Sequence, residues 1–172
     1  MGWRSVRFGA KAPNISPVNE GEIEWIARQV SLAATLVERY APTQQNSPPG
    51  TDQKPIATNS FGQGHAHPLP TLEDIDRLCS TWAADKNSQL DTNALINAVG
   101  VVFGEHLTAQ ADLRWVIATD KQGTELAVFN ETRGITLYPQ NLVTKRVVSR
   151  EIPFAVELFD ATTKEITQIR AR

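Results

Sequence analysis

The sequence lacks the features that mark several common classes of protein. It has one cysteine, Cys79, among 172 residues, so no internal disulfide can form and the cysteine content does not point to a zinc site. The formal net charge is only −2, and the lack of a positive excess argues against a chain whose main task is gripping a nucleic-acid backbone. We therefore expect no nucleic-acid partner, no metal and no cofactor.

Long apolar runs are also missing. The most hydrophobic stretch is interrupted by polar residues too often to span a bilayer. The amino end, residues 1–13, is basic but has no apolar segment of the signal-peptide kind, and Val6 breaks the pattern for N-myristoylation. We expect no membrane association and a cytoplasmic location.

Familiar catalytic signatures are absent as well. The chain contains no GxGxxG, GxxxxGK[ST], GxSxG or HExxH motif and no internal repeat. His65 and His67 have a spacing that can chelate a metal on an extended segment, but no carboxylate or thiol lies near them in sequence. Cys79 falls in an apolar helical stripe and is interpreted as a core side chain, and His106 is interpreted as a helix-end residue. These observations favour a protein that is not an enzyme.

The length and composition of the chain indicate one folded domain with some additional sequence. It is 41% hydrophobic and 21% charged, which suffices for a core without a disulfide or metal. We divide it into an irregular arm and amphipathic helix at residues 1–41, a Pro/Gly/Gln-rich linker at 42–70, and an α+β domain at 71–172. The first helix, from Asn19 to Tyr40, either docks on the domain or is a separate attachment.

The domain itself reads as helices followed by a small sheet. Helical patterns run from Thr71 to Gln89 and from Asp91 to Leu107, and the second contains Gly100 and Gly104, which predict close approach of another backbone. Three β-rich runs and a final helix follow, at residues 114–119, 125–130, 134–138 and 152–169. The predicted fold class is α+β, with helices packed on a three-stranded antiparallel meander and a carboxy-terminal helix.

Alternation along the three strands predicts two apolar faces. One carries Trp115, Ile117, Leu126, Val128, Ile135 and Leu137, and the other carries Val116, Ala118, Ala127, Phe129 and Tyr138. The second face must be covered, and the carboxy-terminal helix is our first choice. The alternative is a partner, either another protein or a second copy, that contacts Val116, Ala118, Phe129 and Tyr138.

A basic group follows the sheet. Lys145, Arg146 and Arg150 come after a short helix that begins at Pro139, and they have the chemistry to bind a phosphate or a carboxylate. Acidic residues follow closely, so an ion-paired or solvated surface is the stronger interpretation. The alternative function is a small-ligand or anion binder, possibly an enzyme, that uses these three residues near Trp115, which serves either as a core anchor or as a pocket wall.

A set of short motifs resembles one known family. The set comprises the helix start at residues 91–96 (DTNALI), Phe103-Gly104, Arg114-Trp115-Val116 before Asp120 and Gly123, Leu137-Tyr138-Pro139, and Val143-Thr144-Lys145-Arg146. Together these motifs resemble a bacterial family catalogued as domain of unknown function 3806, over residues 69–169. The resemblance implies a cytoplasmic α+β domain and carries over no catalytic or binding residues. The leading hypothesis is a non-enzymatic protein-interaction module of adaptor, chaperone-like or immunity type.

Overall fold

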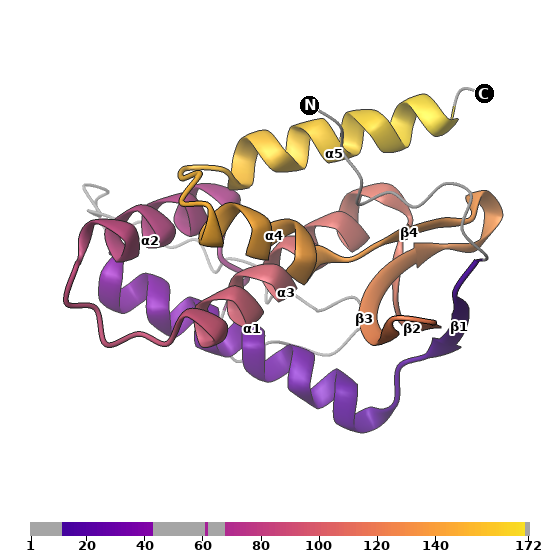
Figure 1. Ribbon diagram of the computed structural model, residues 1–172, viewed down its shortest axis with the longest axis horizontal. Coiled ribbons are helices and arrows are strands. Elements are labelled where there is room, and N and C mark those ends of the chain that lie inside the picture. The colour runs from indigo at the N-terminus through magenta and orange to yellow at the C-terminus, as the bar shows by residue number, and fades with distance from the viewer. Residues whose placement is uncertain (1–11, 43–60, 62–67, 171–172) are drawn as a thin grey trace, which may run out of the picture.

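The computed structural model describes residues 12–42, 61 and 68–170, and within them the protein is α+β, as predicted (Figure 1). These residues form five α-helices, one short 3-10 helix and a four-stranded antiparallel sheet. In chain order the elements are β1 (Asn14–Pro17), α1 (Glu20–Tyr40), α2 (Leu72–Ala84), α3 (Thr92–Ala111), β2 (Arg114–Asp120), β3 (Gly123–Asn130), η1 (Glu131–Arg133), β4 (Ile135–Leu137), α4 (Pro139–Val148) and α5 (Ala155–Arg170).

Side-chain caps fix the starts of the first three helices, where the sequence places them. The Glu22 backbone N–H donates to Asn19 Oδ1 over 3.0 Å, and the same arrangement recurs between Asp74 N–H and the Thr71 hydroxyl over 3.1 Å. At the start of α3, the Asp91 carboxylate accepts from the backbone N–H of the third helical residue over 2.8 Å. Each cap satisfies an N–H that the first turn of a helix leaves without a partner.

The sheet confirms the predicted meander and adds one strand. Its order is β1-β2-β3-β4, with Trp115 opposite Val128 and the neighbouring residue Val116 opposite Ala127. The added strand β1 pairs Ile15 with Ala118, in a segment that the sequence analysis assigned to an irregular arm. Asn14–Pro17 has no apolar alternation and ends in proline, so its strand conformation depends on pairing with β2 and not on local propensity.

The two glycines of α3 allow α4 and β2 to pack closely against this helix, as the sequence predicted. A Cβ on Gly100 would lie 2.9 Å from the Cα of Gln140, at the start of α4. A Cβ on Gly104 would lie 2.2 Å from the ring of Trp115 on β2. The absence of side chains at these positions therefore sets how closely α4 and the sheet approach α3.

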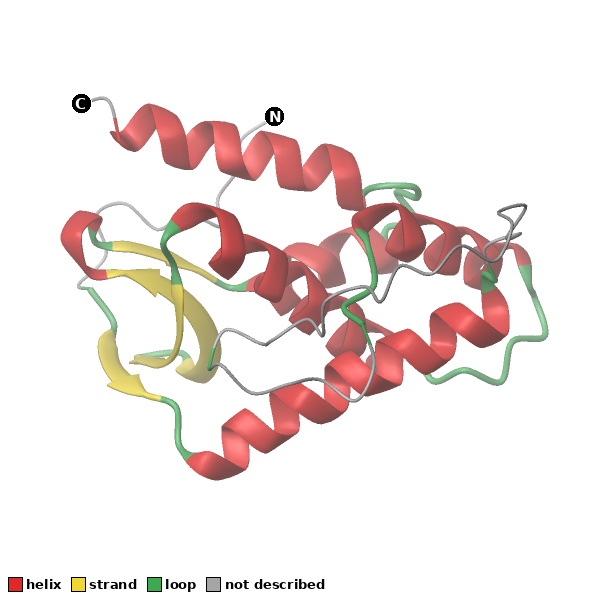
Figure 2. Cartoon of the chain, turned by 180° about the vertical axis from the view of Figure 1, so that it is seen from behind, coloured by secondary structure: helices red, strands yellow, loops and turns green. Residues whose placement is uncertain are grey.

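Helix α1 docks on the rest of the molecule. Ile26 and Val30 are fully buried in the same hydrophobic core as Leu95 and Val99 of α3. In Figures 1 and 2, α1 and α5 lie along opposite edges of the helical part, with the sheet at one end. Most of the predicted linker, residues 43–60 and 62–67, lies outside the described residues, so the division into three segments stays a prediction.

Helix α5 does not cover the second face of the sheet, and the prediction that it would is wrong. It packs on α2 and α3, where the ring of Phe159 meets Phe103 edge-on at 6.0 Å between centroids. Leu158 and Ile166 belong to the same core as α3. The reason is that α3 is apolar around most of its circumference, with twelve of its twenty residues buried, so it offers an apolar surface to α5 as well as to α1.

Candidate functional site

Trp115 is a core residue. Its side chain is only 2% exposed, and its indole Nε1–H donates to Glu105 Oε1 over 2.8 Å. The edge of the ring fills the space that Gly104 leaves on α3. Of the two roles that the sequence left open for this tryptophan, the structure shows the core anchor.

Glu105 is a buried acid that the sequence analysis did not single out. It is 4% exposed, on a helix whose other buried residues are apolar or glycine. A carboxylate in such surroundings requires hydrogen-bond donors, and the Trp115 indole is one of them. The signal was visible in the sequence, because this glutamate directly follows the apolar run from Val99 to Gly104.

The three basic residues have different surroundings. Lys145 is exposed, and Arg146 forms an ion pair with Glu151. The guanidinium of Arg150 lies over the ring of Trp82, 5.6 Å from its centroid, and donates from Nη1 to the carbonyl oxygen of Ala83 over 3.2 Å. The two arginines are thus anchored by side chains and backbone of this chain.

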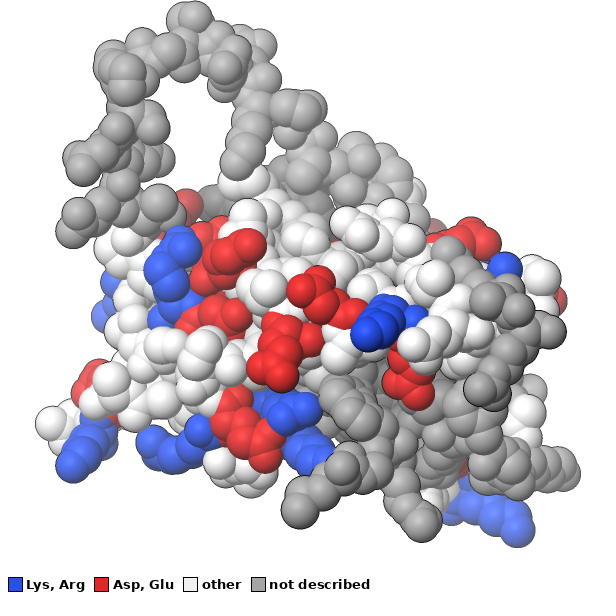
Figure 3. All heavy atoms as spheres, turned by 90° about the horizontal axis from the view of Figure 1, so that it is seen from above, with Lys and Arg blue, Asp and Glu red and all other residues white. Residues whose placement is uncertain are grey.

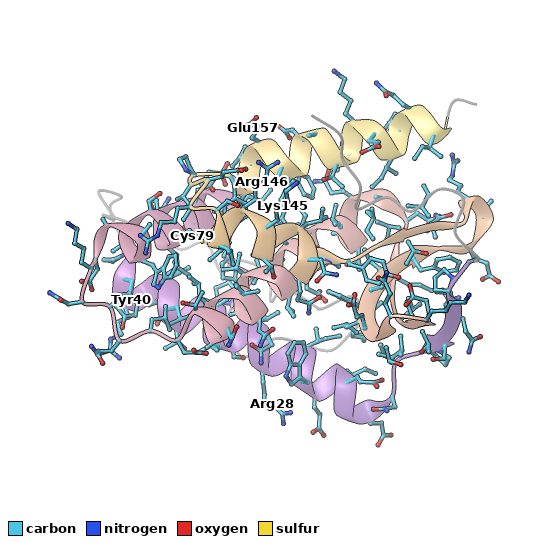
Figure 4. The ribbon with its side chains drawn as sticks, in the orientation of Figure 1. Arg28, Tyr40, Cys79, Lys145, Arg146 and Glu157 are labelled. Carbon is cyan, nitrogen blue, oxygen red and sulfur yellow. The ribbon has the colours of Figure 1, made fainter. Side chains whose placement is uncertain are left out.

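Arg146 and Arg150 nevertheless line one pocket, which we term the α4–α5 pocket. It has a volume of about 310 Å³ and lies between the carboxy end of α4 and the first turns of α5. Its lining comprises Arg146, Arg150, Glu151, Ile152, Pro153, Phe154, Glu157, Leu158 and Ala161. Lys145 and Trp115 are not part of this lining. Figure 4 shows Arg146 between the two helices, with Glu157 on α5 and Lys145 on α4.

The end of α4 determines the shape of this pocket. The backbone N–H of Arg150 donates to Val147 O over 3.1 Å, and that of Glu151 donates to Arg146 O over 2.9 Å. Arg150 has a φ of 53°, the left-handed conformation that commonly ends a helix and that glycine usually adopts. This reversal separates the last turn of α4 from the first turn of α5 and leaves a hollow between them.

The opposite wall of the pocket is held by Asp76 of α2. Its carboxylate accepts three backbone N–H groups at the start of α5, from Phe154 over 2.7 Å, Ala155 over 2.6 Å and Val156 over 3.2 Å. Asp76 is therefore the amino-terminal cap of a helix that begins almost eighty residues later. Local sequence patterns contain no signal for such a distant cap.

Cys79 is buried one turn away from Asp76 on α2 (Figure 4). Burial, and to a smaller degree the negative charge of Asp76, raise the pKa of this thiol from 9.0 to about 12. Because the thiolate is the nucleophilic form, the thiol is unreactive near neutral pH. The structure supports the interpretation of Cys79 as a core side chain.

The histidines do not form a site in the described part of the chain. His106 is inside α3, which continues to Ala111, so its predicted helix-end role is wrong. Its Nε2 lies 2.9 Å from the carbonyl oxygen of Pro70 and donates to it, which ties α3 to the residues before α2. His65 and His67 lie outside the described residues. Among the residues that are described, no three His, Cys, Asp or Glu side chains gather closely enough to hold a metal ion.

The second face of the sheet forms a small hydrophobic cluster of its own. Val116, Ala118 and Ala127 are at most 2% exposed, and Ile15, Phe129 and Tyr138 pack around them half-buried. None of the described helices contributes a buried residue to this cluster. The accessible part of the predicted partner surface is therefore Phe129 and Tyr138, and not Val116 or Ala118.

A smaller pocket borders this face beside Tyr138. Its volume is about 210 Å³, and most of its lining residues have a polar group: Asn97, Glu125, Leu126, Tyr138, Gln140 and Asn141. Within it, Asn141 Nδ2 donates to Glu125 Oε2 over 2.9 Å. Amide, carboxylate and phenol groups thus lie next to the apolar cluster.

Two broader properties of the described residues complete this description. Acidic and basic side chains lie intermixed over the described surface seen from the side of α5, without a large field of one sign (Figure 3). None of the helices within residues 12–42 and 68–170 combines the length and apolar character that crossing a bilayer requires.

Comparisons with known proteins give a family without an assigned activity. No curated protein matches the chain. The crystal structure of a protein from Bacteroides thetaiotaomicron VPI-5482 is similar with a TM-score of 0.58 at 12% identity, over 92% of this chain and 51% of that one. This chain thus spans about half of that protein, and the likeness concerns the fold alone. A family model described as "Domain of unknown function (DUF3806)" matches residues 72–159, just over half of the chain, and the protein belongs to this family.

Proposed function

We propose that the protein is a non-enzymatic protein-interaction module and that it binds its partner through the second face of the sheet. We name this surface the outer sheet face: its partly accessible residues are Ile15, Phe129 and Tyr138, which surround the buried Val116, Ala118 and Ala127. The observation that carries the proposal is that this face is apolar, while none of the described helices packs a buried residue against it. Apolar patches with a polar rim mark protein–protein interaction sites, which is the basis for proposing an adaptor, chaperone-like or immunity-type module.

The arrangement of side chains on this face supports the proposal. Phe129 and Tyr138 place aromatic rings beside the buried cluster, and tyrosine combines an apolar ring with a polar tip, which suits an interface. Arg114 lies over the Phe129 ring at 6.0 Å and pairs with Glu131 over 3.4 Å at one border. An apolar centre with a polar rim is the common anatomy of protein interfaces.

The surroundings of two potentially reactive groups among the described residues support a non-enzymatic role. The thiol of Cys79 is buried and protonated at neutral pH, because burial raises its pKa to about 12. The guanidinium of Arg146 is paired with Glu151. These groups are used inside the fold, whereas the aromatic rings of the outer sheet face are partly accessible.

Site-specific photo-crosslinking tests the proposal. Benzoylphenylalanine is introduced in place of Phe129, and in a control chain in place of Gln168, which is exposed on α5, in cells that naturally make the protein. We expect a discrete product from position 129 only, identified by mass spectrometry; a product of twice the chain mass would identify a second copy as the partner. Identical products from both positions, or none from position 129, would refute the proposal.

Binding by purified components completes the test. The identified partner is titrated with the wild-type chain and with Phe129→Ser, and the folded state of each is checked by circular dichroism. We expect at least a tenfold loss of affinity, which corresponds to about 1.4 kcal/mol, for a variant that remains folded. Equal affinity of the folded variant would exclude the outer sheet face as the contact surface.

A further inference from the structure

The α4–α5 pocket is a second candidate site, built from other elements than the outer sheet face. Its volume of about 310 Å³ is at the lower end of ligand pockets, which measure roughly 300–1,000 Å³. Its apolar lining residues are Ile152, which is half-buried, and Phe154 and Leu158, which are only 4% and 3% exposed. These dimensions and this lining suit a small molecule that carries one apolar group.

The charges around the pocket narrow the class of ligand. Four charged residues line it, two arginines and two glutamates. The ion pair between Arg146 and Glu151 balances one charge of each sign. Arg150 and Glu157 remain, and among the described residues the exposed carboxylate of Glu157 has no hydrogen-bond or ion-pair partner. The pocket thus offers one positive and one negative group to a ligand.

Contacts with α2 position the guanidinium of Arg150 and leave it donors for an anionic group. Its guanidinium is stacked on Trp82 and uses one N–H for the carbonyl oxygen of Ala83, and a guanidinium has five N–H donors. The stacking and the left-handed backbone fix the position of the side chain. A group held in this way loses little conformational freedom when it binds a carboxylate.

We propose that the α4–α5 pocket binds a small zwitterion with an apolar side chain, the chemical class of the free apolar amino acids. Arg150 receives the carboxylate, Glu157 receives the ammonium group, and Ile152, Phe154 and Leu158 contact the alkyl group. A phosphate dianion is disfavoured by the two glutamates, and a simple cation by the two arginines. The proposal does not depend on a protein partner at the sheet.

A panel of four probes tests the proposed ligand class with the full-length chain. L-Leucine has both charges and an apolar group, 4-methylpentanoate lacks the amine, 3-methylbutylamine lacks the carboxylate, and glycine lacks the alkyl group. Binding is followed by shifts of the backbone amide signals in two-dimensional NMR spectra. We expect leucine to bind with a Kd on the order of 0.1–1 mM, as suits a small ligand in an open pocket. Each truncated probe should bind at least tenfold more weakly.

Two variants locate the site. Glu157→Gln should weaken leucine binding at least tenfold and leave 4-methylpentanoate binding unchanged, because only the contact with the ammonium group is lost. Asp160→Asn is the matched control, since this exposed residue lies one turn further along α5 and outside the pocket lining, and it should bind leucine like the wild type. Neither side chain forms a hydrogen bond or an ion pair with the described residues, so both variants should remain folded.

Three outcomes would overturn the proposal. The first is the absence of saturable leucine binding up to about 10 mM, well above the expected Kd. The second is equal binding of all four probes, which indicates no recognition of the zwitterion. The third is a set of leucine-induced shifts that does not include residues 146–161, or a set that Glu157→Gln leaves intact.

Discussion

Replacing Asp76 by alanine should loosen α5 from the rest of the fold. The Asp76 carboxylate accepts three backbone N–H groups at the start of α5, at 2.7, 2.6 and 3.2 Å. In Asp76→Ala these donors lose their partner, and water reaches them only in part because the site is half-buried. The helix that they begin carries Leu158, Phe159 and Ile166 into the main core, so the loss should reduce the stability of the whole domain.

The magnitude follows from the kind of contact that is lost. Removing a side-chain cap from a helix costs about 1 kcal/mol and up to about 2. A hydrogen bond to a charged group contributes about 1.5–3 kcal/mol, and three bonds to one carboxylate are not additive. We expect Asp76→Ala to lower the free energy of unfolding by about 2–3 kcal/mol, and Asp76→Asn, which keeps one oxygen acceptor, by about half of that.

Urea denaturation followed by circular dichroism measures this effect. Glu73→Ala is the control, because Glu73 is an exposed acid in the first turn of the same helix, and its loss should cost about 0.5 kcal/mol. We expect the midpoint of Asp76→Ala to fall while the slope of the transition stays unchanged. If Asp76→Ala were no less stable than Glu73→Ala, the cap between α2 and α5 would contribute nothing and the reasoning would be wrong.

Three further predictions concern the core. Burial raises the pKa of Cys79 from 9.0 to about 12, so between these pH values only the thiol of the unfolded chain ionises. Raising the pH from 8 to 10 should therefore lower the free energy of unfolding of the wild type by about 1.4 kcal/mol more than that of Cys79→Ala. Denaturation of both proteins at both pH values measures this difference. Equal pH dependence would contradict this. Gly104→Ala should lower the free energy of unfolding by about 3 kcal/mol or more, because the new Cβ would lie 2.2 Å from the Trp115 ring. If the variant is as stable as the wild type in urea, α3 and β2 can separate without a loss of stability. Trp115→Phe should lower the free energy of unfolding by about 2–4 kcal/mol, since it removes the 2.8 Å hydrogen bond to the buried Glu105 and part of the ring. A decrease below about 1 kcal/mol in the same assay would show that this hydrogen bond does not stabilise the fold.

Local rules predicted the parts of the fold whose causes are local. Asn19, Thr71 and Asp91 are caps because their side chains reach N–H groups only three residues away. Strand alternation correctly separated the face of Trp115 from the face of Val116, because successive side chains of a strand point to opposite sides. These features need no knowledge of which elements meet.

The features that sequence reasoning missed depend on contacts between distant segments. Strand β1 exists because β2 offers an edge to pair with, and the position of α5 depends on Asp76 and on the apolar surface of α3. The basic group illustrates the same limit for the site. Nearness in sequence grouped Lys145 with Arg146 and Arg150, whereas the left-handed turn at Arg150 brings only the two arginines to the pocket.

Helix α4 connects the two proposed sites, and its packing makes them independent. Its amino end borders the outer sheet face through Tyr138, and its carboxy end lines the α4–α5 pocket through Arg146, about 12 Å away for the rise of eight helical residues. A helix could couple the sites by sliding, but Gln140 lies so close to Gly100 that no methyl group fits between them. Because α4 is fixed at that end, leucine affinity should be the same in Phe129→Ser as in the wild type, and a change above threefold would show that α4 moves.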